Sequence, residues 1–412
     1  MRSLPRHARC AQPDWNQAHM TVRTLTLYHA AVPLKKAIRH ASHVRTTSDS
    51  LVVRVTLDDG QVGYGEGVPR VYVTGETIET AFSMLATLDV ARAIGTTGDF
   101  AEVLRRVGSM TLPEIESDPR GMAGNAARCA LELALLDAFG RRHGASVGRA
   151  ILLADVPGLR RHDRPQWVRY SGAITAESAW RERVSAWKMW LYGFVQTKLK
   201  VGVAGQDDPA RLARMRRILG RRMDLRIDAN EAWPAAEVLE RVRPLRPFAP
   251  SALEQPVPHA EVDALADLRP ALRVPVMLDE SLCGLPDATR ALERRTADLF
   301  NVRLSKCGGI LPSLRIIALA QRAGLGVQLG CHPGETGLLS AAGRHVAGLV
   351  RGLRYVEGSY DRHVLAANLT VEDPTFGYGG WARPLSGPGL GVTVDAAALE
   401  AMTVRREEVD YG

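Results

Sequence analysis

The chain has 412 residues, which is enough for one large domain plus a smaller one, with a well-buried core. Hydrophobic residues make up 46% and charged residues 24%, a composition typical of globular proteins and unlike that of disordered or fibrous chains. No apolar run approaches the roughly 20 residues that a membrane-spanning helix needs, so we expect no membrane contact.

The formal net charge of +8 raises nucleic-acid binding as a function class. The basic residues, however, are mostly arginines that lie beside acidic residues in predicted helices, as in "RLARMRRILGRR" at 211–222. Few aromatic residues are interleaved with them. Solvated helix faces explain this charge better, and we expect no nucleic-acid partner.

Residues 1–20 are basic but contain no apolar core of the kind that a signal peptide needs, so we expect a disordered extension there. The five cysteines are scattered and form no spaced framework, which suits a reducing compartment. Both observations favour a cytoplasmic protein.

The segment 21–150 is predicted to form an α+β module. Its first part alternates apolar and polar residues around a "DDG" turn in "SLVVRVTLDDGQVGYGEG" (50–67), the pattern of an antiparallel hairpin. Residues 77–142 follow with helical patterns such as "AARCALELALLDAFGRR". We therefore expect antiparallel strands followed by helices.

From 160 to 375 short apolar runs alternate with longer amphipathic stretches. There are eight such runs: 167–174, 194–200, 224–230, 251–256, 275–281, 299–305, 326–331 and 353–358. Eight β-then-α units in sequence predict a parallel barrel rather than an open sheet. The last part, 376–412, begins with a Gly/Pro-rich stretch, and we expect it to return to the α+β module.

Charged residues stand at the ends of successive predicted strands. In chain order they are Lys198, Lys200, Asp228, Glu254, Asp279 and Arg303. They are separated by about one βα unit each from Lys200 onward, so they should ring the C-terminal mouth of the barrel, where such folds carry their catalytic groups. A single acid at a strand end is usually a helix cap, but three in register indicate a shared site.

This constellation predicts a chemistry. Asp228, Glu254 and Asp279 form a hard oxygen site that suits Mg²⁺. A divalent metal can hold a substrate carboxylate and stabilise the enolate that forms when its α-proton leaves. Only six of the 53 basic residues are lysines, and two of them form "KLK", whose strand period puts both on one face. We predict Lys200 as the base and Lys198 as the cation that neutralises the substrate carboxylate.

The ordered set "TKLKVG", "DAN", "EQP", "DES", "SKCGG" and "GPGLGVTVD" resembles the enolase superfamily, and within it the muconate cycloisomerase and dipeptide epimerase subgroup. The resemblance spans about 21–400. It implies a modified TIM (β/α)8 barrel with an N-terminal α+β capping domain that the C-terminal segment completes. It also implies Mg²⁺ on Asp228, Glu254 and Asp279, and proton transfer by Lys200. "YVTGET" (72–77), with Tyr72, resembles the loop that closes over substrate.

The chain departs from the subgroup on its sixth strand. Enzymes of that subgroup carry there a second lysine that faces the first one across the substrate, whereas this chain has Arg303. Lys306 lies three residues on, on the other face or in the following turn, and is predicted to be structural. Arginine is always protonated, so two-base epimerisation is placed in doubt. One-base cycloisomerisation or elimination by Lys200 remains open.

Other residues are predicted to contact substrate by the same resemblance. Cys331 aligns with a substrate-contacting cysteine, and His332 beside it could act as an acid or base or be a structural turn residue. Glu357 falls where cycloisomerases have a glutamate, and the paired aspartates of dipeptide epimerases are missing. Ser171 on the first strand is either a substrate contact or a packing residue.

These observations together predict a Mg²⁺-dependent isomerase or lyase that removes the α-proton of a small carboxylate to form a metal-stabilised enolate. A cycloisomerase-like or lyase reaction is preferred, and a dipeptide or N-acyl amino acid epimerase or racemase is the alternative. A metal-binding pseudo-enzyme that lost turnover through Arg303 is the second alternative. A homo-oligomer is expected from the resemblance.

Overall fold

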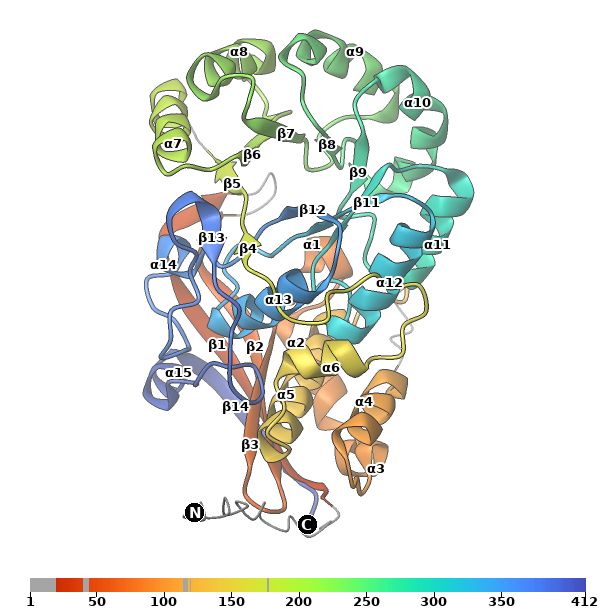
Figure 1. Ribbon diagram of the computed structural model, residues 1–412, viewed down its shortest axis with the longest axis vertical. Coiled ribbons are helices and arrows are strands. Elements are labelled where there is room, and N and C mark those ends of the chain that lie inside the picture. Colours follow the sequence, from red (N-terminus) through yellow and green to blue (C-terminus); the bar gives the residue numbers. More distant parts are fainter. Residues whose placement is uncertain (1–19, 40–43, 114–117, 119, 176–177) are drawn as a thin grey trace, which may run out of the picture.

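The computed structural model describes residues 20–39, 44–113, 118, 120–175 and 178–412. The extension predicted for 1–20 lies almost entirely outside the described residues. Two layers of structure are visible in Figure 1, with a ring of strands and helices above a smaller sheet and its helices.

The smaller part is built on a four-stranded antiparallel sheet in the order β14-β1-β2-β3. The strands are β1 (Val22–Arg39), β2 (Val44–Leu57), β3 (Val62–Gly67) and β14 (Thr403–Asp410). The predicted hairpin joins β2 to β3 through a turn in which Gly60 has a φ of 83°, a conformation that glycine adopts without strain. The strand β14 pairs antiparallel with β1, so residues far apart in the sequence build one sheet.

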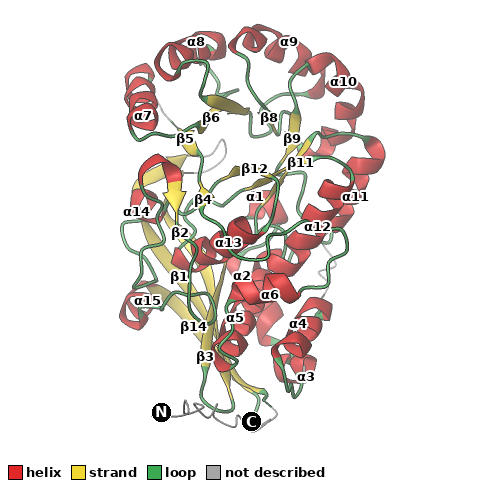
Figure 2. Cartoon of the chain, in the orientation of Figure 1, coloured by secondary structure: helices red, strands yellow, loops and turns green. Residues whose placement is uncertain are grey.

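Helices cover one face of this sheet (Figure 2). They are α1 (Val71–Thr74), α2 (Ile78–Ala86), α3 (Val90–Ile94), α4 (Phe100–Ser109), α5 (Asn125–Arg142) and α6 (Val147–Leu153). The central helix α5 packs directly on β3, because Gly63, Gly65 and Gly67 present no side chain to it. A Cβ at any of the three would collide with the α5 backbone. The alternating glycines of "VGYGEG" thus bring helix and strand together.

The larger part is an eight-stranded parallel sheet in the order β5 to β12. Its strands are β5 (Gly172–Ile174), β6 (Gln196–Lys200), β7 (Asp224–Asp228), β8 (Leu253–Glu254), β9 (Val276–Leu278), β10 (Leu299–Val302), β11 (Gly326–Leu329) and β12 (Leu353–Val356). Each lies in one of the eight predicted runs. The backbone N–H of Ser171 donates to the carbonyl of Val356 at 2.8 Å, which links the first strand to the last.

Helices lie outside these strands. They are α7 (Ala179–Leu191), α8 (Asp208–Leu219), α9 (Val238–Val242), α10 (Leu265–Leu272), α11 (Leu285–Arg294), α12 (Ile310–Arg322) and α13 (Gly337–Leu349), with η1 (Ala235–Glu237), η2 (Arg243–Phe248) and η3 (His259–Ala264) as short 3-10 turns. The C-terminal segment contains α14 (Asp361–Val364), η4 (Tyr378–Gly380), β13 (Trp381–Ala382) and α15 (Ala396–Met402), and β13 pairs with β4 (Val168–Arg169). The predicted fold class, a modified TIM barrel with an α+β cap, is confirmed.

The cap contacts the barrel at the C-terminal ends of its strands. The carboxylate of Glu66, on β3, accepts hydrogen bonds from the backbone N–H groups of Thr336 and Leu339, which open α13. Next to it, the backbone N–H of Val68 donates to Ser305 Oγ at 2.8 Å, in the turn after β10. The barrel mouth therefore faces the cap.

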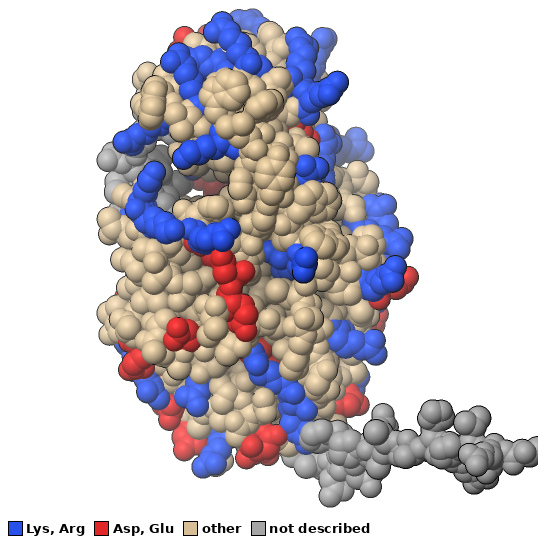
Figure 3. All heavy atoms as spheres, turned by 60° about the vertical axis from the view of Figure 1, so that its left-hand side comes forward, with Lys and Arg blue, Asp and Glu red and all other residues tan. Residues whose placement is uncertain are grey.

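The distribution of charged side chains on the surface is relevant to the expectation that no nucleic acid binds. On the face drawn in Figure 3, Lys and Arg side chains are separated by uncharged surface and by acidic side chains, and they form no single continuous basic stripe. Within the described residues, no helix is both long and apolar enough to cross a membrane.

Candidate active site

Three buried carboxylates lie at the ends of adjacent strands. Asp228 is the last residue of β7, Glu254 the last of β8, and Asp279 directly follows β9. Asp228 and Glu254 are paired in register, and at most 2% of any of the three residues is exposed. The parallel sheet thus brings together three acids that are separated by about 25 residues in sequence.

Lys198 lies among these carboxylates. Its Nζ is 3.2 Å from Glu254 Oε1, 3.3 Å from Asp228 Oδ2 and 3.2 Å from Glu357 Oε2. Burial alone lowers the pKa of Lys198, but the charges of the surrounding carboxylates outweigh it and raise the pKa above its ordinary value. Lys198 therefore keeps its proton and acts as a fixed cation.

Lys200 ends the same strand and has different surroundings. It is paired in register with Asp228 on β7 and is partly exposed. Among the described residues it makes no hydrogen bond or ion pair. Of the two "KLK" lysines, Lys200 is thus the one whose amine is not held by a carboxylate.

Arg303 and Lys306 both bind Asp279, on different oxygens. Arg303 Nη2 donates to Oδ2 and lies 3.9 Å from Glu254 Oε1. Lys306 Nζ donates to Oδ1 at 2.7 Å, to the backbone carbonyl of Asp279 at 2.6 Å and to that of Asn301 at 2.9 Å. Arg303 therefore points at the carboxylates, while Lys306 is enclosed in the turn after β10.

The donor chemistry of the three acids fits a hard divalent cation, although the described residues contain no group of three His, Cys, Asp or Glu side chains already arranged around a metal position. Lys198 and Arg303 contact the oxygens instead. Beside them, Glu280 has a buried Oε2 without a partner, and burial together with the charges of Asp228, Glu231 and Glu254 raises its pKa to about 7. A bound cation would offset the repulsion between these carboxylates.

Glu357 follows β12 and connects Lys198 to a buried arginine. Its Oε1 accepts from Arg226 Nη2 at 2.8 Å, and Arg226 also donates to Ser171 Oγ at 2.6 Å. The Arg226 guanidinium is fully buried and lies 4.2 Å from the centre of the Tyr355 ring. Glu357 therefore already forms ion pairs with two cations, Lys198 and Arg226. The Oγ of Ser171 accepts a hydrogen bond from Arg226.

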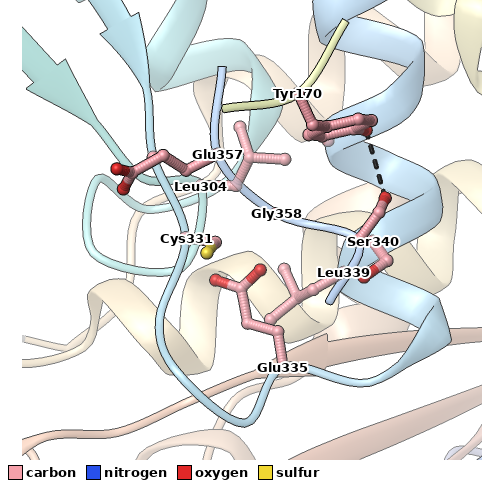
Figure 4. Close-up of a pocket in the computed structure, with 11 residues that line it drawn as sticks. Tyr170, Leu304, Cys331, Glu335, Leu339, Ser340, Glu357 and Gly358 are labelled. Atoms are coloured by element: carbon pink, nitrogen blue, oxygen red, sulfur yellow. Dashed lines mark hydrogen bonds between the residues drawn. The ribbon is translucent and has the colours of Figure 1, made fainter. Parts of the chain in front are cut away.

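A small pocket opens next to Glu357 (Figure 4). Cys331, Glu335, Leu304, Leu339 and Tyr170 contribute to its lining. The carboxylate of Glu335 points towards Cys331 in this view. Its Oε1 accepts the backbone N–H of His332 at 2.6 Å, and burial raises the pKa of Glu335 to about 8. A carboxyl group that is largely protonated at neutral pH thus borders the pocket.

His332 and Tyr72 lie where the cap meets the barrel. His332 is 3% exposed, and burial together with the charges of Arg303, Arg70, Lys306 and Arg45 lowers its pKa well below the ordinary value. The hydroxyl of Tyr72, on α1, lies 3.5 Å from Arg45 Nη2. His332 is therefore a neutral side chain in positive surroundings.

Sequence reasoning missed three groups. Arg226 lies inside the barrel in a strand whose pattern reads as ordinary, and Glu280 follows a predicted ligand without a signal of its own. Glu335 lies two residues before α13, where an acidic side chain is favourable for the helix alone. Its one sequence signal was the position four residues after Cys331, in "GCHPGETG".

Comparison with known families agrees with this geometry. Residues 181–398 match the family described as enolase C-terminal domain-like, and residues 22–151 match the mandelate racemase / muconate lactonizing enzyme N-terminal domain. The chain belongs to the mandelate racemase / muconate lactonizing enzyme group of the enolase superfamily. Its homologues are enzymes, and the predicted membership and enzyme class are confirmed.

Three relatives illustrate the range of this group. The chain is 27% identical over 393 residues to an N-succinyl-L-Arg/Lys racemase of Bacillus cereus, which covers 95% of this chain and 100% of the relative. It is 29% identical over 382 residues to muconate cycloisomerase 1 of Rhodococcus opacus, with 90% and 95% covered. The solved dipeptide epimerase of Cytophaga hutchinsonii, complexed with Mg and D-Ala-L-Val, superposes with a TM-score of 0.79 at 25% identity over 95% of this chain and 100% of its own.

Proposed function

We propose that this member of the superfamily removes the α-proton of a small carboxylate substrate with Lys200 as its single base, in a cycloisomerisation or an elimination. The carrying observation is that Arg303 directly follows β10, the strand across the barrel from β6, and that it is bound to Asp279 and close to Glu254. An arginine cannot accept a proton at neutral pH, so it cannot serve as the second base.

Each residue of the site has a part in this reaction. Lys198 stays protonated among three carboxylates and would neutralise the substrate carboxylate. Lys200, which no carboxylate holds, would take the α-proton on its Nζ and, in an elimination, return it to the leaving hydroxyl on the same face. Arg303 would stabilise negative charge that develops on the opposite face.

Asp228, Glu254 and Asp279 would hold the divalent metal, for which we propose Mg²⁺. When bound, such a cation supplies Lewis-acid stabilisation of the charge that accumulates on the substrate carboxylate. In this structure Lys198 contacts Asp228 and Glu254, and Arg303 contacts Asp279. Both cations would have to move from these carboxylates toward the substrate when the metal binds. The chemistry of the donor set and the unpaired Oε2 of Glu280 support this assignment.

Racemisation or epimerisation is the second candidate. The names of several relatives favour it, among them the Bacillus cereus racemase and a hydrophobic dipeptide epimerase of Enterococcus faecalis. It requires a second acid on the face opposite Lys200, and Glu335 is a group of this chain that could supply one. Glu335 borders the pocket and is largely protonated at neutral pH.

Proton NMR in D₂O separates these reactions. The enzyme with Mg²⁺ is incubated with single enantiomers of N-acyl amino acids, dipeptides, sugar acids and muconates. The one-base proposal expects α-deuteration with retained configuration, or direct formation of a lactone or dehydrated product, and Lys200→Met should abolish either. Racemisation with α-deuteration would refute it in favour of the second candidate. No exchange with any substrate, although Mg²⁺ binds, would support a pseudo-enzyme.

A further inference from the structure

Arg226 is a fully buried cation inside the barrel, deeper than the three carboxylates of the site. It lies on β7 two residues before Asp228, and because side chains alternate along a strand the two point to the same face. It is paired in register with Lys198 on β6. Among the residues that the structure describes, Glu357 is the one carboxylate at ion-pair distance from it. Arg226 therefore belongs to the charged network of the site, although its ion pair is with Glu357 and not with a predicted metal ligand.

Stability alone does not account for this arginine. Its Nη2 donates to Glu357 Oε1 at 2.8 Å and to Ser171 Oγ at 2.6 Å, but its Nε and Nη1 are buried without a hydrogen-bond partner among the described residues. Buried donors without partners cost free energy, and a buried ion pair can often be replaced by apolar side chains of similar volume without loss of stability. An arginine with unpaired donors in a barrel interior therefore needs a functional explanation.

The surroundings of Arg226 hold its guanidinium in one place. The guanidinium lies 4.2 Å from the centre of the Tyr355 ring, which is a cation–π contact. Tyr355 is itself anchored, since its hydroxyl donates to Ser251 Oγ at 3.0 Å. Held by this ring and by Ser171, the guanidinium donates to Glu357 Oε1. The orientation of the Glu357 carboxylate is thus set by a side chain that is fixed from two other sides.

The second oxygen of Glu357 holds Lys198. Lys198 Nζ lies 3.2 Å from Glu357 Oε2, and its two other carboxylate partners, Asp228 and Glu254, are predicted metal ligands. Lys198 would lose these two acceptors to a bound cation. Glu357, which directly follows β12 and is not a predicted ligand, is then the carboxylate that Lys198 can keep.

We propose that Arg226 is a positioning residue, which fixes the Glu357 carboxylate so that Glu357 retains Lys198 when the metal occupies Asp228 and Glu254. The inference rests on the proposed function in one respect, that Mg²⁺ binds these ligands. Lys198 then stays beside the site as the cation that neutralises the substrate carboxylate. Substitution of outer partners that orient the groups of a metal site typically weakens metal binding by about 10–100-fold.

The charge of Arg226 by itself would have the opposite effect on metal binding. Burial raises the pKa of Glu254, but the charges of Lys198, Arg303 and Arg226 together lower it below its ordinary value. A cation whose field reaches a ligand also repels a metal ion, so removal of the charge alone should tighten Mg²⁺ binding. Weaker binding after the loss of Arg226 would therefore report its contact with Glu357 and not its charge.

Calorimetry with Mg²⁺ alone tests this role. Arg226→Met, Glu357→Gln and the double variant form a double-mutant cycle. Arg226→Lys, which keeps a cation as partner for Glu357, is the conservative variant. Arg216→Met is the matched control, because Arg216 Nη1 donates to the carbonyl of Met223 at 2.7 Å, at the opposite end of β7, and its other donors also bind backbone carbonyls. Unfolding midpoints are measured for every variant.

Arg226→Met should weaken Mg²⁺ binding about tenfold or more, and Arg226→Lys should restore it to within about threefold of wild type. In the Glu357→Gln background the methionine substitution should weaken binding no further, because Arg226 acts through Glu357. Arg216→Met should lower stability and leave Mg²⁺ affinity unchanged. Unchanged or tighter Mg²⁺ binding in Arg226→Met, or an equal loss in both backgrounds, would overturn the inference.

Two further measurements keep this result separate from folding and from the proposed reaction. If Arg226→Met does not fold, the same cycle is run with Arg226→Gln, which also lacks the charge but is polar. Asp228→Asn checks the metal assignment: if it abolishes Mg²⁺ binding while Arg226→Met changes nothing, the metal site stands and the positioning role falls. If the effect of Arg226→Met holds while Lys200-dependent α-exchange is not found, the proposed reaction falls and the positioning role stands.

Discussion

Replacement of Lys306 by methionine tests whether this lysine holds the site together. The side chain is fully buried, and its Nζ serves three acceptors: the carboxylate Oδ1 and backbone carbonyl of Asp279, and the carbonyl of Asn301. Methionine retains much of the volume but donates no hydrogen bond. The substitution therefore removes a hydrogen-bond donor from buried acceptors and one partner from a buried ion pair.

The expected loss in the free energy of unfolding depends on the interactions that Asp279 keeps in the variant. Breaking a buried pair from one side costs about 3–5 kcal/mol. Asp279 keeps Arg303 on its other oxygen, and its carbonyl also accepts the N–H of Leu282 at 2.9 Å. We therefore expect a loss at the lower end, about 3 kcal/mol in the free energy of unfolding.

Guanidinium unfolding followed by tryptophan fluorescence measures this loss. Lys188→Met is the matched control, because Lys188 is exposed on α7 and should change stability by no more than about 0.5 kcal/mol. A Lys306→Met protein as stable as this control would refute the structural role. Lys306 would then be available for proton transfer, and the one-base proposal would need revision.

Three further outcomes are expected. Arg303→Lys should add a titratable group opposite Lys200. A substrate whose α-deuteration retains configuration with the wild-type enzyme should then be racemised by the variant. Unchanged stereochemistry by NMR would count against Arg303 as the reason for one-base behaviour. Glu335→Gln should leave α-exchange largely unchanged, whereas a loss of about 100-fold or more, the scale of a general acid, would favour the epimerase candidate. Burial raises the pKa of Glu66 from 4.5 to about 7, so its contribution to stability is fully present below about pH 4.5 and is lost as the pH rises through 7. Denaturation midpoints should fall over this range less steeply in Glu66→Gln than in wild type.

The barrel and the positions of its charged residues could be predicted because both depend on local repeats. Each strand is a short apolar run, and parallel strands end at the same edge. Asp228, Glu254 and Asp279 meet there for that reason alone. The period of two likewise put Lys198 and Lys200 on one face, and both lie beside the β7 carboxylate.

Local repeats stop being informative where a strand ends. The strand β10 ends at Val302, and the following turn carries Lys306 back to Asp279. Counting along the strand could place Lys306 in that turn but could not identify its partner 27 residues away. Arg226 was missed for a related reason, since its partners Glu357 and Ser171 are the residue after β12 and the residue before β5.

Residues at the strand ends of the barrel are easier to find in the sequence than residues where the cap meets the barrel. The proposed reaction uses residues at strand ends of one repeating architecture, so equal spacing reveals them. Arg45, Arg70 and His332 share no such spacing, since they come from β2, the residue before α1 and the turn after β11. Arg303 follows β10, and its Nη2 binds Asp279 while its Nε is buried without a hydrogen-bond partner among the described residues. A substitution of Arg303 should therefore alter the reaction, because this side chain binds one of the three predicted metal ligands.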